Sequence, residues 1–351
     1  MRPSNLAVAV AATAASTAQA CASPPTSNSQ SGTPLATMHQ GFNYGNSNST
    51  GGCRTHDDYT RLFNLARSLP APGQDVAFTS ARLYTSIECG TEGSAAPRPI
   101  SAFQAAVDTN TTLLVGLWAS SGQDGFTREL NTLVAALADP GYGAQLAALV
   151  VGVAVGSEDM FRADAIARGT CGPDVAHCQA GATAGEIAAY VQQARAALQG
   201  TALAGVAIGH VDTPAAWLLD GAAALVQQLD WVGHNSYPYW EASGQDNGID
   251  TAGGRFDGAL GITIGAAGSR PVWVTETGWP SSGPKSGNAE ASPANAMKYW
   301  DEVGRQRLFG QRCTWWYILE DSNPDQSALS FAIWDTNTGQ TRFALDGSGG
   351  G

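Results

Sequence analysis

The sequence predicts an α/β protein built as one (β/α)8 TIM barrel. Three observations support this fold class. Eight short apolar runs alternate with helical patterns along the chain. The runs are almost continuously apolar, as in a parallel sheet that is covered on both faces. The 351 residues, 43% of them hydrophobic, also suffice for a single barrel core.

Each predicted strand is a short, mostly apolar run bounded by helical or turn patterns. The eight strands are expected at Gln40–Tyr44, Ser80–Tyr84, Thr112–Trp118, Val150–Gly156, Leu203–Gly209, Trp231–Ser236, Val272–Thr275 and Thr314–Ile318.

Between these runs, apolar residues recur at three- and four-residue spacing, which is typical of helices that cover a sheet. The predicted helices are Asp57–Ser68, Ile100–Asn110, Phe126–Leu137, Ala184–Leu198, Pro214–Gln228, Phe256–Ala267 and Pro293–Leu308.

The first 22 residues predict a secretory signal peptide. Arg2 precedes an apolar stretch, and the small residues Ala18-Gln19-Ala20 and Ala20-Cys21-Ala22 offer two cleavage positions. Residues 23–37, rich in Ser, Pro and Thr, predict a disordered lead-in to a domain at 38–345, and residues 346–351 form a Gly-rich tail. No later segment predicts a membrane-spanning helix. We expect a protein secreted to the extracellular space or the cell wall.

The net charge of the chain limits the classes of molecule that it is expected to bind. A net charge of −12 disfavours binding to nucleic acid or to anionic membranes, which requires clustered Lys and Arg. A neutral polymer remains compatible with this charge.

The cysteines lack paired C-x-x-C spacing and the five histidines are scattered, so no metal site is predicted. We expect a monomer.

An oxidising compartment favours disulfides among Cys53, Cys89, Cys171 and Cys178. The expected pairs are Cys53 with Cys89 and Cys171 with Cys178. Cys21 is expected to leave with the signal peptide. Cys313 begins an apolar strand and is expected to be a small buried thiol.

Two acidic residues stand at the ends of predicted strands. Glu276 closes the seventh strand and precedes Thr-Gly-Trp-Pro, and Glu158 closes the fourth strand. In a (β/α)8 barrel both strand ends lie at the catalytic mouth. A pair of carboxyl groups is what glycoside hydrolysis requires, and a separation of about 5–5.5 Å would allow direct attack with retention of configuration.

Apolar surroundings of Glu158 favour a protonated acid, while Glu276 is the candidate nucleophile. Each has an ordinary alternative: Glu276 could form a structural ion pair, and Glu158 could stabilise a helix N-terminus or pair with Arg162. Arg82, on the second strand, is a candidate buried charge that tunes the two acids.

Other side chains at the predicted mouth are candidates for substrate contact, since aromatic rings stack on the apolar faces of sugars. Tyr84, Trp118 and Trp240 fit either a sugar contact or the core. His210 could contact substrate or have a structural role. Glu320 could bind a sugar hydroxyl, orient a catalytic carboxylate, or be a solvated surface acid. The candidate substrate-binding residues are Tyr44, Tyr84, Tyr237, Trp279, Ser157, His210 and Glu320.

Five motifs together resemble glycoside hydrolase family 17, in its fungal cell-wall endo-β-1,3-glucanase branch. The resemblance extends from Gly41 to Phe343, and Ser157 departs from the Asn that commonly precedes the acid in the wider clan. The motifs lie at residues 41–45, 79–84, 155–158, 208–213 and 272–280.

The resemblance implies a retaining hydrolase in which Glu276 is the nucleophile and Glu158 the acid/base. It also implies β-1,3-glucan as substrate, cleavage of internal bonds, and no metal or organic cofactor. Two alternatives remain open: a β-1,3-glucanosyltransferase that remodels wall glucan, and a non-catalytic glucan-binding wall protein.

Overall fold

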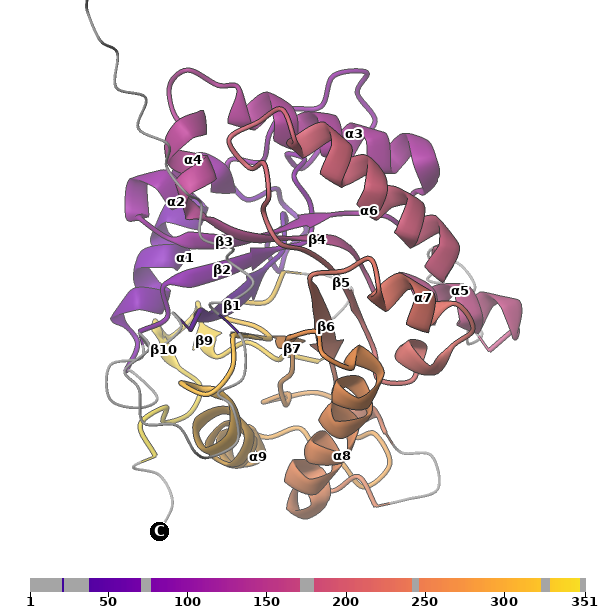
Figure 1. Ribbon diagram of the computed structural model, residues 1–351. Coiled ribbons are helices and arrows are strands. Elements are labelled where there is room, and N and C mark those ends of the chain that lie inside the picture. Colours follow the sequence, from indigo (N-terminus) through magenta and orange to yellow (C-terminus); the bar gives the residue numbers. More distant parts are fainter. Residues whose placement is uncertain are drawn as a thin grey trace, which may run out of the picture.

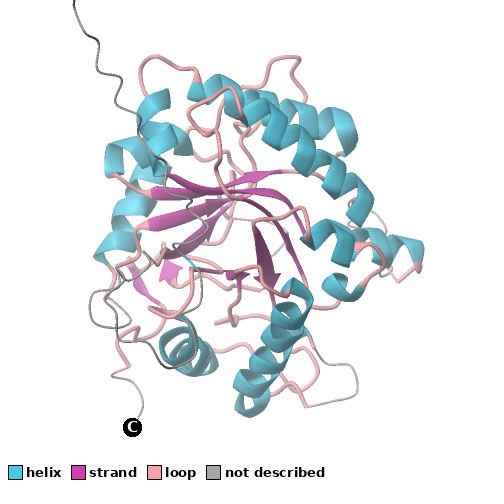
Figure 2. Cartoon of the chain, viewed as in Figure 1, coloured by secondary structure: helices cyan, strands magenta, loops and turns pink. Residues whose placement is uncertain are grey.

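The computed structural model describes residue 21 and residues 38–70, 77–170, 180–241, 246–322 and 329–347. Eight parallel strands close into a barrel in sequential order, which confirms the predicted fold class. Helices surround the strands (Figures 1 and 2). The strands are β1 (Gln40–Tyr44), β2 (Ser80–Leu83), β3 (Thr112–Leu117), β4 (Val150–Ser157), β5 (Ile208–Asp212), β6 (Trp231–Asn235), β7 (Val272–Glu276) and β8 (Thr314–Trp316).

Two of the surrounding helices begin with capping boxes. Thr55 and Thr183 form capping boxes with Asp58 and Glu186, so that side chains satisfy the free backbone groups of the first turn. The helices are α1 (His56–Ser68), α2 (Ala102–Thr109), α3 (Gly122–Leu137), α4 (Gly143–Leu149), α5 (Asp159–Ala167), α6 (Ala184–Leu198), α7 (Ala222–Val226), α8 (Ile249–Ala267) and α9 (Pro293–Tyr299).

Short turns complete the connections. The 3₁₀ turns η3 (Ala216–Leu218) and η4 (Pro238–Trp240) follow β5 and β6, and the π-helical η5 (Trp300–Leu308) continues α9. A small antiparallel ribbon of β9 (Trp334–Asp335) and β10 (Gln340–Thr341) follows the barrel.

Several elements differ from the sequence prediction. β5 begins at Ile208 instead of Leu203, because the chain before it turns at Gly205, where φ is +82°. The helix expected over 214–228 is divided into η3 and α7, because Gly221 has a φ of +85° between them. The helices α4 and α5 were not predicted at all.

The base of the barrel interior is filled by tryptophan rings. Trp231 and Trp273 stack with centroids 4.2 Å apart, and Trp315 packs beside them. Glycines on β4 and β5 make this possible, because a Cβ at Gly152 or Gly209 would lie within 3.0 Å of an indole atom. The larger hydrophobic core lies between the strands and the helices.

The disulfides confirm one prediction and correct another. Cys53 is bonded to Cys89 as predicted. Cys313 is not a free thiol, because it is bonded to Cys21 at the base of the barrel. Loss of Cys21 with a leader would remove this bond, whereas cleavage after Ala20 would keep it. The predicted pair of Cys171 and Cys178 lies outside the described residues. Among the described helices, none is long and apolar enough to cross a membrane.

Candidate active site

A cavity of about 1850 Å³ opens at the carboxyl ends of the strands, and both Glu158 and Glu276 line it. Glu158 directly follows β4 and Glu276 ends β7; the two residues are 118 positions apart in the chain, but the two strands belong to one closed sheet. The predicted candidates Ser157, Tyr84 and Tyr237 also line this cavity. The position of the strand ends therefore gathers five of the predicted residues around one space.

Glu276 is the last residue of β7, and both of its carboxylate oxygens accept hydrogen bonds. Arg82 Nη1 donates to Oε1 at 2.5 Å, and the Tyr237 hydroxyl donates to Oε2 at 2.7 Å. Arg82 is fully buried, so its positive charge has little competition from water. A second amino group of Arg82 donates to Ser157 Oγ at 2.9 Å. Arg82 thus links the ends of β7 and β4.

Glu158 lies between β4 and α5 in a left-handed backbone conformation, with φ +58° and ψ +28°. This conformation costs a non-glycine residue on the order of 1–3 kcal/mol and persists only where the surroundings enforce it. The Glu158 amide donates to the Val211 carbonyl at 2.8 Å, and the Met160 amide donates to Asp212 Oδ2 at 2.9 Å. β5 therefore fixes the chain on both sides of Glu158.

The pKa of Glu158 is raised from 4.5 to about 7. Burial is the largest cause, and the negative charge of Glu276 adds to it. Asn235 opposes the shift, because its Nδ2 donates to Glu158 Oε1 at 2.9 Å and so favours the ionised form. Asn235 is itself oriented by Thr275, whose hydroxyl donates to Asn235 Oδ1 at 2.7 Å.

The environments of the two glutamates differ in a chemically useful way. Glu158 can remain protonated up to near-neutral pH and can donate a proton, whereas Glu276 presents a carboxylate held between a guanidinium and a phenol. Two neighbouring carboxyl groups in different environments are the usual basis for separate acid and nucleophile roles.

Tyr84 places an aromatic ring beside the same centre. Its ring lies under the guanidinium of Arg82, with Cζ 4.6 Å from the ring centroid. Burial, followed by the charge of Glu276, raises the pKa of its hydroxyl well above 10. The phenol therefore stays neutral and able to donate.

Four predicted substrate contacts lie away from this cavity. Trp279 is buried, packs against Tyr239, and donates from Nε1 to the Glu290 carbonyl at 2.9 Å. Tyr44 is buried against Phe63, with ring centroids 5.0 Å apart.

His210 and Glu320 are also occupied by protein partners. His210 is fully buried, and its two ring nitrogens contact the Val155 carbonyl and Asp212 Oδ2. Glu320 forms ion pairs with Arg54 at 2.8 Å and Arg61 at 2.9 Å and lines a separate cavity of about 250 Å³. These four side chains therefore lie outside the lining of the main cavity, and their contact with substrate stays a prediction.

The sequence did not point to Asn235 or Asn43, two buried amides that hold the side chains of the site. Asn235 ends β6, so the strand-end rule that found the glutamates would have found it too. Asn43 on β1 was also missed; its side chain accepts from Arg82 at 2.6 Å and donates to two strand carbonyls at 2.9 and 3.0 Å. Within the described residues, no three His, Cys, Asp or Glu side chains gather as a possible metal site.

Residues 41–327 match the family model of the BtgE/BtgC glycoside hydrolase domain. The chain belongs to this family. The predicted resemblance to fungal glucanases is thereby confirmed at the level of the family.

Relatives and solved structures agree with this assignment. The chain is 43% identical to the "Probable glucan endo-1,3-beta-glucosidase eglC" of Aspergillus fumigatus over 84% of its length and 62% of the relative. It is 41% identical to the Aspergillus oryzae protein of the same name over 84% of its length and 60% of the relative. The chain therefore spans about three fifths of the length of these curated relatives.

The fold is shared with the crystal structure of a glycoside hydrolase family 17 β-1,3-glucanosyltransferase from Rhizomucor miehei. The TM-score is 0.66 at 22% identity, covering 88% of this chain and 97% of that one. An endo-laminarinase from Formosa Hel1_33_131 has a TM-score of 0.61 at 13% identity, with 84% and 83% of the two chains covered.

Proposed function

We propose that this glycoside hydrolase domain is a retaining enzyme that cleaves internal bonds of β-1,3-glucan. The observation that carries the proposal is the pair of carboxyl groups in one cavity, with the pKa of Glu158 raised to about 7 and Glu276 bonded to Arg82 and Tyr237. The names of the Aspergillus relatives support the substrate class.

In the proposed first step, a Glu276 oxygen attacks the anomeric carbon and the glycosidic bond to the leaving sugar breaks. Glu158 gives its proton to the departing oxygen. In the second step, water gives a proton to the Glu158 carboxylate. The water oxygen bonds to the anomeric carbon and displaces Glu276. Arg82 and Tyr237 hold the nucleophile in place throughout.

The test is the pair of variants Glu276→Gln and Glu158→Gln on laminarin. Glu276→Gln should abolish the release of reducing sugar. Glu158→Gln should slow it by roughly 10²–10⁴-fold, the contribution of a positioned general acid. Azide should partly restore Glu158→Gln on an activated aryl glycoside and give a β-glycosyl azide, which also reports retention.

The matched control is Glu290→Gln, because the Glu290 side chain is exposed and its carboxylate pairs with Lys285 at the surface. It should keep the activity of the unmodified chain. Normal turnover by Glu276→Gln, or an α-configured initial product from the unmodified chain, would contradict the assignment.

We also propose that the protein is secreted. The N-terminal leader pattern, the disulfides Cys21–Cys313 and Cys53–Cys89, and the fungal glucanase relatives support an oxidising extracellular destination. Detection of the mature chain in culture medium or in a wall fraction is the direct check.

A further inference from the structure

The cavity that holds the two glutamates continues into a region with exposed apolar walls. The described part of the chain exposes six large hydrophobic side chains, and four of them line this one cavity. Leu218 is 67% exposed, Trp240 53%, Phe161 45% and Ile262 43%. Exposed apolar groups that gather in a concave site usually mark a binding surface.

The region is built from short, well-supported elements. Leu218 ends η3 and Trp240 ends η4, the turns that follow β5 and β6. The Trp240 ring packs edge-on against Tyr239, with centroids 5.0 Å apart, so it is held in place although it is exposed. The hydroxyl of Tyr239 donates to the Pro284 carbonyl.

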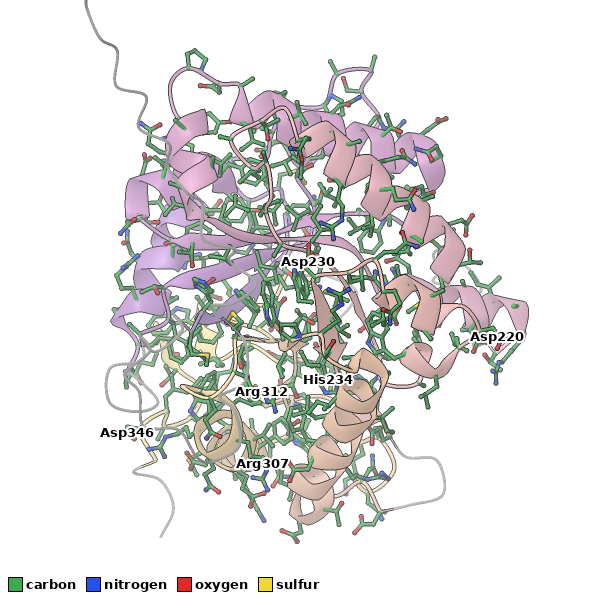
Figure 3. All side chains as sticks on the ribbon, viewed as in Figure 1. Asp220, Asp230, His234, Arg307, Arg312 and Asp346 are labelled. Carbon is green, nitrogen blue, oxygen red and sulfur yellow. A yellow bond between two sulfur atoms is a disulfide. The ribbon has the colours of Figure 1, made fainter. Side chains whose placement is uncertain are left out.

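The floor of this region is one face of α8. Gly254, Gly258 and Ile262 lie one turn apart and line the cavity, and a Cβ at either glycine would meet nothing within 4 Å. The absence of two side chains therefore leaves open space along the helix. His234 of β6 lies toward α8 (Figure 3), where its Nδ1 is 2.8 Å from Thr263 Oγ1, and this contact fixes the helix against the barrel.

The position of the region relative to the two glutamates indicates its occupant. A general acid gives its proton to the oxygen between the cleaved sugar and the leaving group, so the leaving group lies on the side of the acid. Phe161 is in α5, three residues after Glu158, and α5 contacts both β5 and η3. The apolar walls therefore extend from the side of Glu158.

The size and chemistry of the region fit a sugar chain. The whole cavity exceeds the roughly 300–1000 Å³ of a small-ligand pocket, so it has room for several rings. Apolar walls suit the C–H faces of sugars, and Glu241, Arg255 and Asp246 at the same cavity offer partners for hydroxyl groups. Continuity with the two carboxyl groups favours a glucan over a protein partner.

We propose that Trp240, Leu218 and Ile262, above the glycine face of α8, bind the leaving glucan and then an acceptor glucan. This inference rests on the proposed function. In transfer, a hydroxyl oxygen of the acceptor bonds to the anomeric carbon, the ester bond to Glu276 breaks, and the acceptor proton goes to the Glu158 carboxylate. Occupancy of this acceptor region sets the ratio of transfer to hydrolysis, because a bound sugar displaces the water that would otherwise react.

The experiment compares Trp240→Ala and Gly258→Leu with the unmodified chain. Trp240→Ala removes the aromatic wall, and Gly258→Leu fills the floor while replacing glycine by a better helix former. The matched control is Gly261→Leu, on the same helix but outside the cavity and also with open space at its Cβ. Melting temperatures verify that all three variants are folded.

Two substrates separate the acceptor region from the reaction centre. On laminarihexaose, Trp240→Ala and Gly258→Leu should lower kcat/KM about tenfold and should lower the ratio of transfer products to hydrolysis products at least as much. On β-laminaribiosyl fluoride, whose leaving group is only a fluoride ion, hydrolysis should stay within about twofold. Gly261→Leu should match the unmodified chain on both substrates.

The two possible failures are distinguishable. If the unmodified chain acts on neither substrate, the proposed function and this inference both fail. If the unmodified chain acts on both, and the two variants keep its kcat/KM and its product ratio on laminarihexaose, only the acceptor region is disproved. An equal loss on the fluoride and on the hexaose would also disprove it, because it would indicate damage to the reaction centre.

Discussion

The proton of Glu158 is controlled by opposing neighbours. Burial and the charge of Glu276 raise its pKa to about 7, and the amide of Asn235 partly offsets that rise. Asn235 also lies opposite Glu276 in the register of β6 and β7, so its backbone is adjacent to one acid while its side chain bonds the other. The site therefore depends on an amide that carries no charge itself.

Replacing Asn235 by Ala should raise the pKa of Glu158 further, because the ionised form loses a donor. The basic limb of kcat/KM, expected near pH 7 in the unmodified chain, should move to higher pH, while kcat falls because Glu158 is less well positioned. The measurement is a pH–rate profile on laminarin. Asn337→Ala, at an exposed turn, is the control and should leave the profile unchanged. An unmoved basic limb in Asn235→Ala would contradict the role of the amide.

At the scale of single residues, strand-end position was a good but incomplete predictor. It placed Glu158, Glu276 and Tyr237 at one cavity, because parallel strands in a barrel end at one mouth. It did not place Trp279 or His210 at the cavity. His210 is on β5, where neighbouring residues face opposite sides of the sheet and the sequence does not reveal which side each takes, and Trp279 lies beyond the end of β7.

Among the elements, the junction of β4 and α5 is the most constrained part of the site. His210 contacts the Val155 carbonyl and the Asp212 carboxylate through its two ring nitrogens, a pattern that the doubly protonated ring satisfies. Burial lowers its pKa, but the hydrogen bond and charge of Asp212 outweigh this and the net shift is upward. The resulting ion pair anchors the Met160 amide, two residues after Glu158.

Replacing Asp212 by Asn should leave His210 without its carboxylate partner and loosen the junction. Because misplacing a catalytic group by about 1 Å can cost on the order of 10²-fold, we expect kcat to fall tenfold or more with KM within about twofold. Steady-state kinetics on laminarin provide the measurement. Asp250→Asn, which breaks the exposed ion pair with Lys298, is the control. A rise in KM alone would indicate a direct substrate contact instead.

Sequence periodicity located most elements but not their interruptions. The pattern over 214–228 reads as one helix, yet Gly221 divides it, and the resulting η3 places Leu218 in the cavity. Nothing in the apolar spacing distinguishes a continuous helix from two short ones when a glycine can adopt either conformation. The acceptor region is therefore built where the sequence prediction was least accurate.

For the molecule as a whole, the fold class was predictable because each of the eight runs must be covered on both faces. The residues that were mispredicted lie within the correct architecture. Two acids with raised pKa values, the buried Glu129 and the half-buried Glu158, make the stability of the fold depend on pH. Burial raises the pKa of Glu129, as it does that of Glu158, from 4.5 to about 7, although donors from Thr85 and Ser86 oppose the shift.

Both raised pKa values make the folded state bind more protons than the unfolded state between about pH 4.5 and 7. Stability should therefore fall as pH rises through this window, by on the order of 3 kcal/mol for each group. Thermal unfolding from pH 4.5 to 8 is the measurement. Glu129→Gln should flatten the decline, whereas Asp220→Asn, at an exposed position (Figure 3), should reproduce it. A melting temperature that increases from pH 5 to 7.5 would contradict this reading.

The bond between Cys21 and Cys313 joins residue 21 to the start of β8, at the end of the barrel opposite the two glutamates. A bead or fusion partner attached before residue 21 would therefore lie at the end of the barrel opposite the two glutamates. Long polysaccharide chains in solution would still have free access to the cavity at the carboxyl ends of the strands. Immobilisation through the N-terminal side of residue 21 should therefore preserve turnover.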